Sequence, residues 1–165
     1  MDTVILYGSS GGNTADVAEK IKDAYGEGVT AIDVADASEE NLNGEFIILG
    51  ISTWGIGDLQ DDFEDFLDTL KEADLSDKTI ALFGLGDQDG YPDTFCDGMG
   101  LVYEAVKDNC KKVVGFTSTD GYEFDESISE VDGQFVGLVI DEDNQSELTD
   151  GRIEKWVKQI KEEVA

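Results

Sequence analysis

Short apolar runs alternate with helical patterns along most of the chain, and this alternation limits the possible folds more than any other feature. Four runs are predicted to be buried strands: Val4–Tyr7, Phe46–Ile51, Thr79–Leu85 and Val113–Phe116. A weaker run covers Val29–Asp33. Nearly continuous apolar runs are typical of parallel strands that are covered on both faces. The pattern therefore predicts a parallel sheet that is buried between layers of helices.

The segments between these runs place apolar residues at helical spacing. The predicted helices cover Asn13–Tyr25, Asp61–Leu70 and Thr94–Asp108, and a last helix begins near Thr149, which we expect to cap it. Strands that alternate with helices favour an α/β fold with a doubly wound, five-stranded parallel sheet. Right-handed crossovers then place helices on both faces of that sheet.

The alternation breaks in the last third of the chain. Residues Ser118–Asp132 are polar and contain glycine, and Gln134–Ile140 has the pattern of one more strand. We expect an inserted loop that interrupts the fifth strand of the sheet. The length of 165 residues fits one domain, so we predict a single domain over residues 1–165.

Acidic residues far outnumber basic ones. The chain has 39 Asp and Glu against 11 Lys and Arg, which gives a net charge of −28, and it has no His. Hydrophobic residues at 40% can still build a core, so the acidity does not indicate disorder. The charge argues against nucleic acids and anionic membranes as partners, and it predicts transient partners with basic faces. The absence of His removes the usual general base and the usual ligand of transition metals.

The cysteines and the chain start indicate the cellular setting. Cys96 and Cys110 could form at most one disulfide, no basic segment precedes an apolar one at the N-terminus, and no apolar run could span a bilayer. We expect a soluble monomer of the reducing cytoplasm.

Cys96 lies near a predicted helix start, which would favour a thiolate, but we interpret it instead as a small buried residue. The run Asp141–Asp143 lacks the spacing of a calcium loop, so we interpret it as a solvated turn and predict no metal.

Doubly wound sheets bind ligands at the carboxyl ends of their strands. The loop after the first strand combines glycines and hydroxyls ahead of a predicted helix, and exposed N–H groups there could bind a phosphate. It matches neither the Walker loop nor the dinucleotide motif, and the first basic residue is Lys20, so neutral dipoles would have to hold the phosphate. The alternative is an ordinary turn with a capping Ser or Asn. The candidate phosphate ligands are Ser9, Ser10, Gly11, Gly12, Asn13 and Thr14.

Each of two further loops carries an aromatic residue next to glycines, Trp54 in one and Tyr91 in the other. A Trp or Tyr at a strand's carboxyl end can stack on a flat ligand, although either could instead cover a helix end or belong to an acidic surface loop. The three loops together describe a site for a phosphorylated planar ring. The candidate ligands are Ser52, Thr53, Trp54, Gly55, Ile56 and Gly57 in the second loop, and Gly84, Leu85, Gly86, Asp87, Tyr91, Thr94 and Phe95 in the third.

These motifs resemble the flavodoxin family, and specifically its long-chain type, over essentially the whole chain. The matching segments are Ile5–Thr14, Thr53–Gln60, Gly84–Tyr91, Ser118–Tyr122 and Asp141–Ser146. The resemblance implies a flavodoxin-like fold and a low-potential one-electron carrier that binds FMN non-covalently. It would shuttle electrons between a flavin reductase and electron acceptors, and the cofactor would supply the redox chemistry.

The resemblance also implies roles for individual residues. Trp54 and Tyr91 would cover the two faces of the flavin, Ser9–Thr14 would hold the phosphate, and the backbones of Gly86 and Asp87 would meet the pyrimidine edge. The sequence departs from the family pattern at three positions, where the usual residues are Thr, Asn and Asn: Gly11, Gly55 and Thr94.

Two redox properties would follow from the resemblance. Gly55 would ease a backbone flip that stabilises the one-electron-reduced flavin, so Gly55→Val should reduce the amount of that form. Acids around the site, such as Asp58 and Asp61, should make the second reduction strongly negative in potential and sensitive to salt.

Three other functions remain open from the sequence. An FMN-dependent quinone reductase of related fold would need a substrate pocket over the flavin. A cofactor-free signalling receiver would need clustered Asp after the first strand, where this chain has Gly8, Ser9 and Ser10. The third is a flavoprotein that serves a single metalloenzyme.

Overall fold

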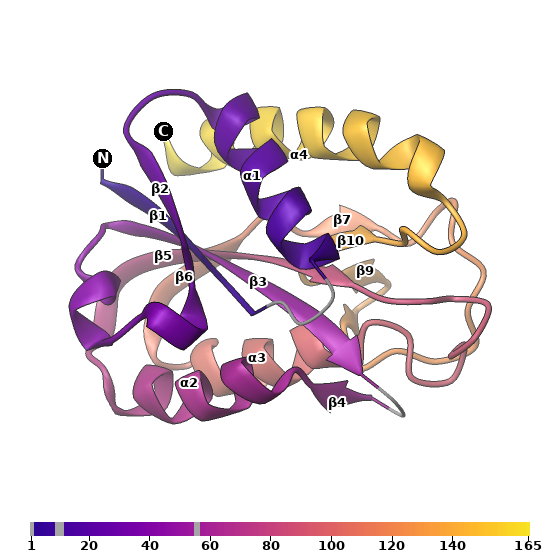
Figure 1. The fold of residues 1–165 in the computed structure, drawn as a ribbon, viewed down its shortest axis with the longest axis horizontal. Helices are drawn as coiled ribbons and strands as arrows, with labels where there is room; N and C mark the ends of the chain where they lie inside the picture. The colour runs from indigo at the N-terminus through magenta and orange to yellow at the C-terminus, as the bar shows by residue number, and fades with distance from the viewer. Residues whose placement is uncertain (1, 9–11, 55–56) are drawn as a thin grey trace.

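The fold is a parallel sheet with helices on both faces (Figure 1). The computed structural model describes residues 2–8, 12–54 and 57–165, and of Trp54 it describes the backbone. The main strands are β1 (Thr3–Tyr7), β2 (Val29–Asp33), β3 (Phe46–Trp54), β5 (Leu75–Leu85), β6 (Cys110–Val114) and β10 (Leu138–Ile140). The helices are α1 (Asn13–Tyr25), α2 (Asp61–Glu72), α3 (Asp97–Val106) and α4 (Thr149–Val164).

The strand order is β2-β1-β3-β5, with the fifth position shared by two strands. β6 pairs with the first part of β5, where Ala81 faces Val114, and β10 pairs with the last part, where Leu85 faces Ile140. All of these pairs are parallel. The predicted doubly wound sheet with an interrupted fifth strand is therefore confirmed.

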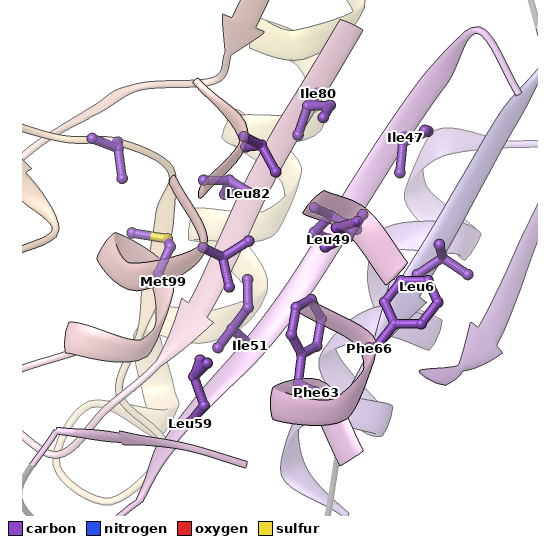
Figure 2. Packing of buried hydrophobic residues seen from close by; sticks show 14 of the residues in the cluster. Leu6, Ile47, Leu49, Ile51, Leu59, Phe63, Phe66, Ile80, Leu82 and Met99 are labelled. Atoms are coloured by element: carbon purple, nitrogen blue, oxygen red, sulfur yellow. The ribbon is translucent and has the colours of Figure 1, made fainter. Parts of the chain in front are cut away.

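Both faces of the sheet are apolar because alternate residues of each strand point to opposite sides. In β3, Phe46 and Ile48 pack under α1 and α4, whereas Ile47 and Leu49 pack on the other side with α2 and α3. Figure 2 shows this second layer, in which Phe63 lies among the strand residues. Covering both faces explains why the strands are nearly continuous apolar runs in the sequence.

The inserted segment forms more structure than the predicted loop. Its three short strands, β7 (Thr117–Ser118), β8 (Glu130–Val131) and β9 (Gln134–Phe135), build a separate antiparallel sheet in the order β7-β9-β8. The predicted strand Gln134–Ile140 is thus wrong as one element, because β9 and β10 belong to different sheets. Between them, Gly137 lies so close to β5 that a Cβ atom there would be 2.1 Å from the carbonyl oxygen of Leu82.

Two predicted helix starts are also wrong. Helix α3 begins at Asp97 and not at Thr94, because Cys96 has a left-handed backbone with φ of 56°. Thr149 does not cap α4: it is the first residue of the helix and is buried, and the chain enters through the 3-10 helix η3 (Ser146–Leu148). The remaining short elements are η1 (Val34–Asp36), η2 (Glu39–Leu42) and β4 (Asp58–Leu59). None of the helices in the described part of the chain is long and apolar enough to cross a membrane.

Candidate functional site

The loops that follow β1, β3 and β5 leave the sheet at the same edge. Tyr7 pairs with Gly50 and Ser52 pairs with Leu85, so the three strands end side by side. The Ser52 hydroxyl donates a hydrogen bond to the carbonyl oxygen of Gly8 at 3.4 Å, which links the first two loops directly. The sheet therefore brings together the three loops that were singled out in the sequence.

The end of the first loop forms the start of α1. Gly12 is the N-cap residue, with a left-handed φ of 89°, and Asn13 and Thr14 are already helical. This excludes the alternative in which Asn13 caps the helix. Lys20, the first basic side chain after the loop, is bound to Asp150 at 2.9 Å. Ser9, Ser10 and Gly11 lie outside the described residues.

The second loop connects two strands that pair with each other. Trp54, at the end of β3, pairs with Asp58 of β4 in an antiparallel arrangement, and Gly57 has a left-handed φ of 85°. The hydroxyl oxygen of Thr53 accepts a hydrogen bond from the Gly98 N–H at 2.9 Å, so this side chain supports the start of α3. Gly55, Ile56 and the side chain of Trp54 lie outside the described residues.

The third loop presents Tyr91 on a compact turn. The Tyr91 side chain is 45% exposed, which is unusual for so large a ring. The turn is closed by a bond from the Tyr91 N–H to the carbonyl oxygen of Asp87 at 2.9 Å. The Asp87 carboxylate accepts from the Gly90 N–H at 2.8 Å, and this bond lowers the pKa of Asp87.

The glycines at the end of β5 have a packing role that the sequence did not reveal. A Cβ atom on Gly84 would lie 2.6 Å from the sulfur of Cys96, and one on Gly86 would lie 2.9 Å from the Cys96 backbone nitrogen. These positions are glycines because the start of α3 lies directly against them. Leu85 between them is buried.

A buried carboxylate, which sequence reasoning missed, anchors the third loop. Asp141 is 0% exposed and accepts hydrogen bonds from the backbone N–H of Gln88 at 3.1 Å and from its side-chain amide at 2.7 Å. It also accepts from the backbone N–H of Asn144 at 3.0 Å and from its side-chain amide at 2.9 Å. The interpretation of Asp141–Asp143 as a solvated turn is therefore wrong for Asp141.

Two residues of this network make further bonds, one to the third loop and one to the inserted segment. The Asn144 amide donates to the Asp87 carboxylate at 2.8 Å, and the side-chain oxygen of Gln88 accepts from the Glu123 N–H at 2.6 Å. The carboxylates of Asp87, Asp141 and Asp143 come close together here. Asp143 is exposed at the residue level, but partial desolvation of its carboxylate, aided by the charges of Asp87 and Asp141, raises its pKa. The absence of a bound metal stays a prediction.

The comparisons with known proteins now decide the family. The family model described as Flavodoxin matches residues 5–156. The chain belongs to the flavodoxin family. It is 52% identical to the flavodoxin of Helicobacter pylori over 158 residues, which cover 95% of this chain and 94% of that protein. It is 45% identical to a Nostoc flavodoxin over 161 residues, with 96% and 95% covered.

A solved structure supports the assignment to the flavodoxin family. The crystal structure of Fusobacterium nucleatum flavodoxin bound to flavin mononucleotide superimposes with a TM-score of 0.94 and 34% sequence identity. The match covers 99% of each chain. The inserted segment is thus part of a fold shared with that flavodoxin over its whole length.

Phe95 and Thr94, the last two candidate ligands of the third loop, differ in burial and in the residues that they contact. Phe95 is 0% exposed and packs against the rings of Tyr122, Phe124 and Phe135. Its backbone N–H donates to the carbonyl oxygen of Glu126 at 3.3 Å, so Phe95 supports the loop from inside. Thr94 is half-buried, and its Cβ lies 3.4 Å from the Cβ position of Gly57.

The buried state of Cys96 predicts its reactivity. Its side chain is 1% exposed and burial strongly raises its pKa, so the helix start does not produce a thiolate. We expect a thiol reagent to modify the half-buried Cys110 first, and Cys96 only when the protein unfolds. Thiol titration of the Cys110→Ser variant, with and without urea, measures this. Rapid modification of Cys96 in the folded variant would contradict the expectation.

Proposed function

We propose that this chain is a low-potential one-electron carrier that uses non-covalently bound FMN, in keeping with its membership of the flavodoxin family. The observation that carries the proposal is the meeting of three loops at one sheet edge, with Tyr91 exposed beside them. Bound FMN would supply the one-electron chemistry, and the protein would hold and surround it. The chain is an electron-transfer flavoprotein and not an enzyme.

The described residues fit such a cofactor. Gly12 directs the start of α1 toward the loop edge, and the N–H groups at a helix start suit a phosphate. The exposed Tyr91 ring suits one face of a flavin. The backbones of Gly86 and Asp87, on a turn anchored by Asp141, suit the polar edge. The other proposed ligands are Ser9, Ser10, Gly11, Asn13, Thr14, Ser52, Thr53, Trp54, Gly55, Ile56, Gly57, Gly84, Leu85, Thr94 and Phe95.

We further propose that the partners of this monomeric, cytoplasmic carrier are a flavin reductase and acceptors with basic faces. The support is the net charge of −28, together with the acids that flank the loop edge, such as Asp58 and Asp89. This charge would steer the loop edge toward basic proteins, with association rates that fall as salt rises.

Reconstitution tests the proposal. FMN added to the apoprotein should bind in a 1:1 ratio, with quenched flavin fluorescence, and stepwise reduction followed by visible absorption should proceed in two one-electron stages. A chain that cannot be reconstituted with FMN contradicts the proposal. Steady-state reduction of a quinone by a nicotinamide, with no reductase present, would favour the quinone reductase instead.

Removing the Tyr91 ring should weaken FMN binding about fivefold to tenfold in Tyr91→Ala. The reason is that stacking on an aromatic ring contributes about 1–3 kcal/mol, and an exposed ring lies at the low end. Flavin fluorescence titration measures the Kd. Tyr91→Phe keeps the ring and should stay within about twofold of the parent. Equal affinities for the Ala and Phe variants would show that Tyr91 does not stack on the flavin.

A further inference from the structure

The start of α3 lies between two segments that are far apart in the sequence. On one side, the Gly98 N–H donates to the Thr53 hydroxyl in the second loop at 2.9 Å. On the other side, the Ser129 hydroxyl of the inserted segment donates to the carbonyl oxygen of Cys96 at 2.6 Å. A Cβ atom on Gly100 would lie 2.7 Å from the backbone of Ile128, so the insertion packs tightly here.

Asp97 is the side chain that faces both segments. Its Oδ1 atom accepts the Ile128 N–H at 2.9 Å. Its Oδ2 atom lies 3.1 Å from the position that a Cβ atom on Gly57 would occupy. One carboxylate therefore contacts the inserted segment with one oxygen and packs against the second loop with the other.

The surroundings of the Asp97 carboxylate disfavour its negative charge. Asp97 is only 9% exposed, and burial raises its pKa, with a further contribution from the negative charge of Glu126. The bond from the Ile128 N–H acts in the opposite direction and stabilises the ionised form. A buried carboxylate is costly unless it is hydrogen-bonded, so its place here depends on the contact with the insertion.

We propose that Asp97 is a positioning residue that links residues 126–129 of the insertion to the hairpin tip, defined here as Gly57 and Asp58. This inference rests on the proposed function, in which that tip flanks the flavin. Gly57 has a left-handed backbone, and Asp97 and Thr94 form the surface against which it packs. Loss of the carboxylate frees the tip and residues 126–129 together, and the pocket for the flavin becomes less well ordered.

Amide hydrogen exchange tests the link without any cofactor. In Asp97→Ala, exchange should accelerate at least tenfold in residues 57–59 and in residues 127–129, while the core of α4 keeps its protection. In Asp97→Asn the amide oxygen can still accept the Ile128 N–H, so exchange at Ile128 should return to within about threefold of the parent. Acceleration confined to one segment, or spread over the whole chain, would overturn the proposal.

Titration with FMN gives the second readout. We expect Asp97→Ala to weaken FMN binding about fivefold and Asp97→Asn to restore most of that affinity. Asp108→Ala is the matched control, because it removes an exposed acid beyond the opposite end of α3, just before β6 begins, and should leave the Kd unchanged. Equal losses in the Ala and Asn variants would mean that charge and not position matters, which overturns the inference. If the parent itself binds no FMN, the proposed function fails, and the exchange experiment still decides the link.

Discussion

Replacing Asp141 with alanine is expected to weaken FMN binding at least thirtyfold and to lower the free energy of unfolding by about 3–5 kcal/mol. The fully buried carboxylate accepts four N–H donors from Gln88 and Asn144. Alanine leaves the two buried donors of Gln88 without this acceptor, and each unpaired buried group costs about 1–3 kcal/mol. Urea unfolding and FMN titration of the variant measure the two effects.

The loss of FMN affinity should exceed that of the Tyr91 variant because Asp141 anchors the whole turn. Without it, Gln88 loses two bonds, and Asn144 loses its fixed position beside Asp87. The turn that presents Tyr91 and the backbones of Gly86 and Asp87 is then free to move, so several proposed flavin contacts weaken together.

A neighbouring acid provides the control for this experiment. Asp143→Asn removes a charge from the same group of carboxylates, but Asp143 is exposed. Because the pKa of Asp143 is raised in the fold, its ionised form is disfavoured, and the variant should be at least as stable as the parent at neutral pH. If Asp143→Asn were as damaging as Asp141→Ala, the loss of charge would explain both results and the anchoring role would be wrong.

The sheet and the helices could be predicted because the apolar patterns that indicate them lie within short stretches of the sequence. The predicted bounds of β2 and α1 agree with the structure, and Gly26 and Gly28, both with positive φ, separate these two elements. The start of β5 was missed because Ser76 and Asp77 are polar, although β5 already begins at Leu75. The two-residue strands of the insertion are too short to show any periodicity.

The parts of the site that depend on distant contacts could not be predicted. Asp141 stands in a run of acids that has the composition of a surface turn, and its burial depends on Gln88, which is 53 residues away. The left-handed backbone of Cys96 could not be predicted from the neighbouring sequence, because a cysteine rarely adopts positive φ. The three loops were found because their glycines, hydroxyls and aromatics are typical of a binding site at a strand end.

The net charge of −28 leads to the second large effect: FMN should bind more tightly as salt rises, with a Kd at least tenfold lower in about 0.5 M KCl than in about 0.01 M. Each acid about 10 Å from the doubly charged phosphate opposes binding by about 0.8 kcal/mol before screening. Three such acids contribute roughly 2.4 kcal/mol, or about sixtyfold in Kd, before screening. Lys20, the nearest basic residue in the sequence, is already paired with Asp150 and offers little compensation.

Riboflavin separates this effect from a general influence of salt on the fold. It has the same ring but no phosphate, so its Kd should change by less than about threefold over the same range. A phosphate held by lysine or arginine would bind more weakly at high salt, because screening would remove an attraction. A site formed by N–H dipoles in an acidic protein gains affinity instead, because screening removes a repulsion while the short hydrogen bonds persist. The sign of the salt dependence of FMN, measured against riboflavin, therefore decides whether the start of α1 and its loop bind the phosphate without a cation.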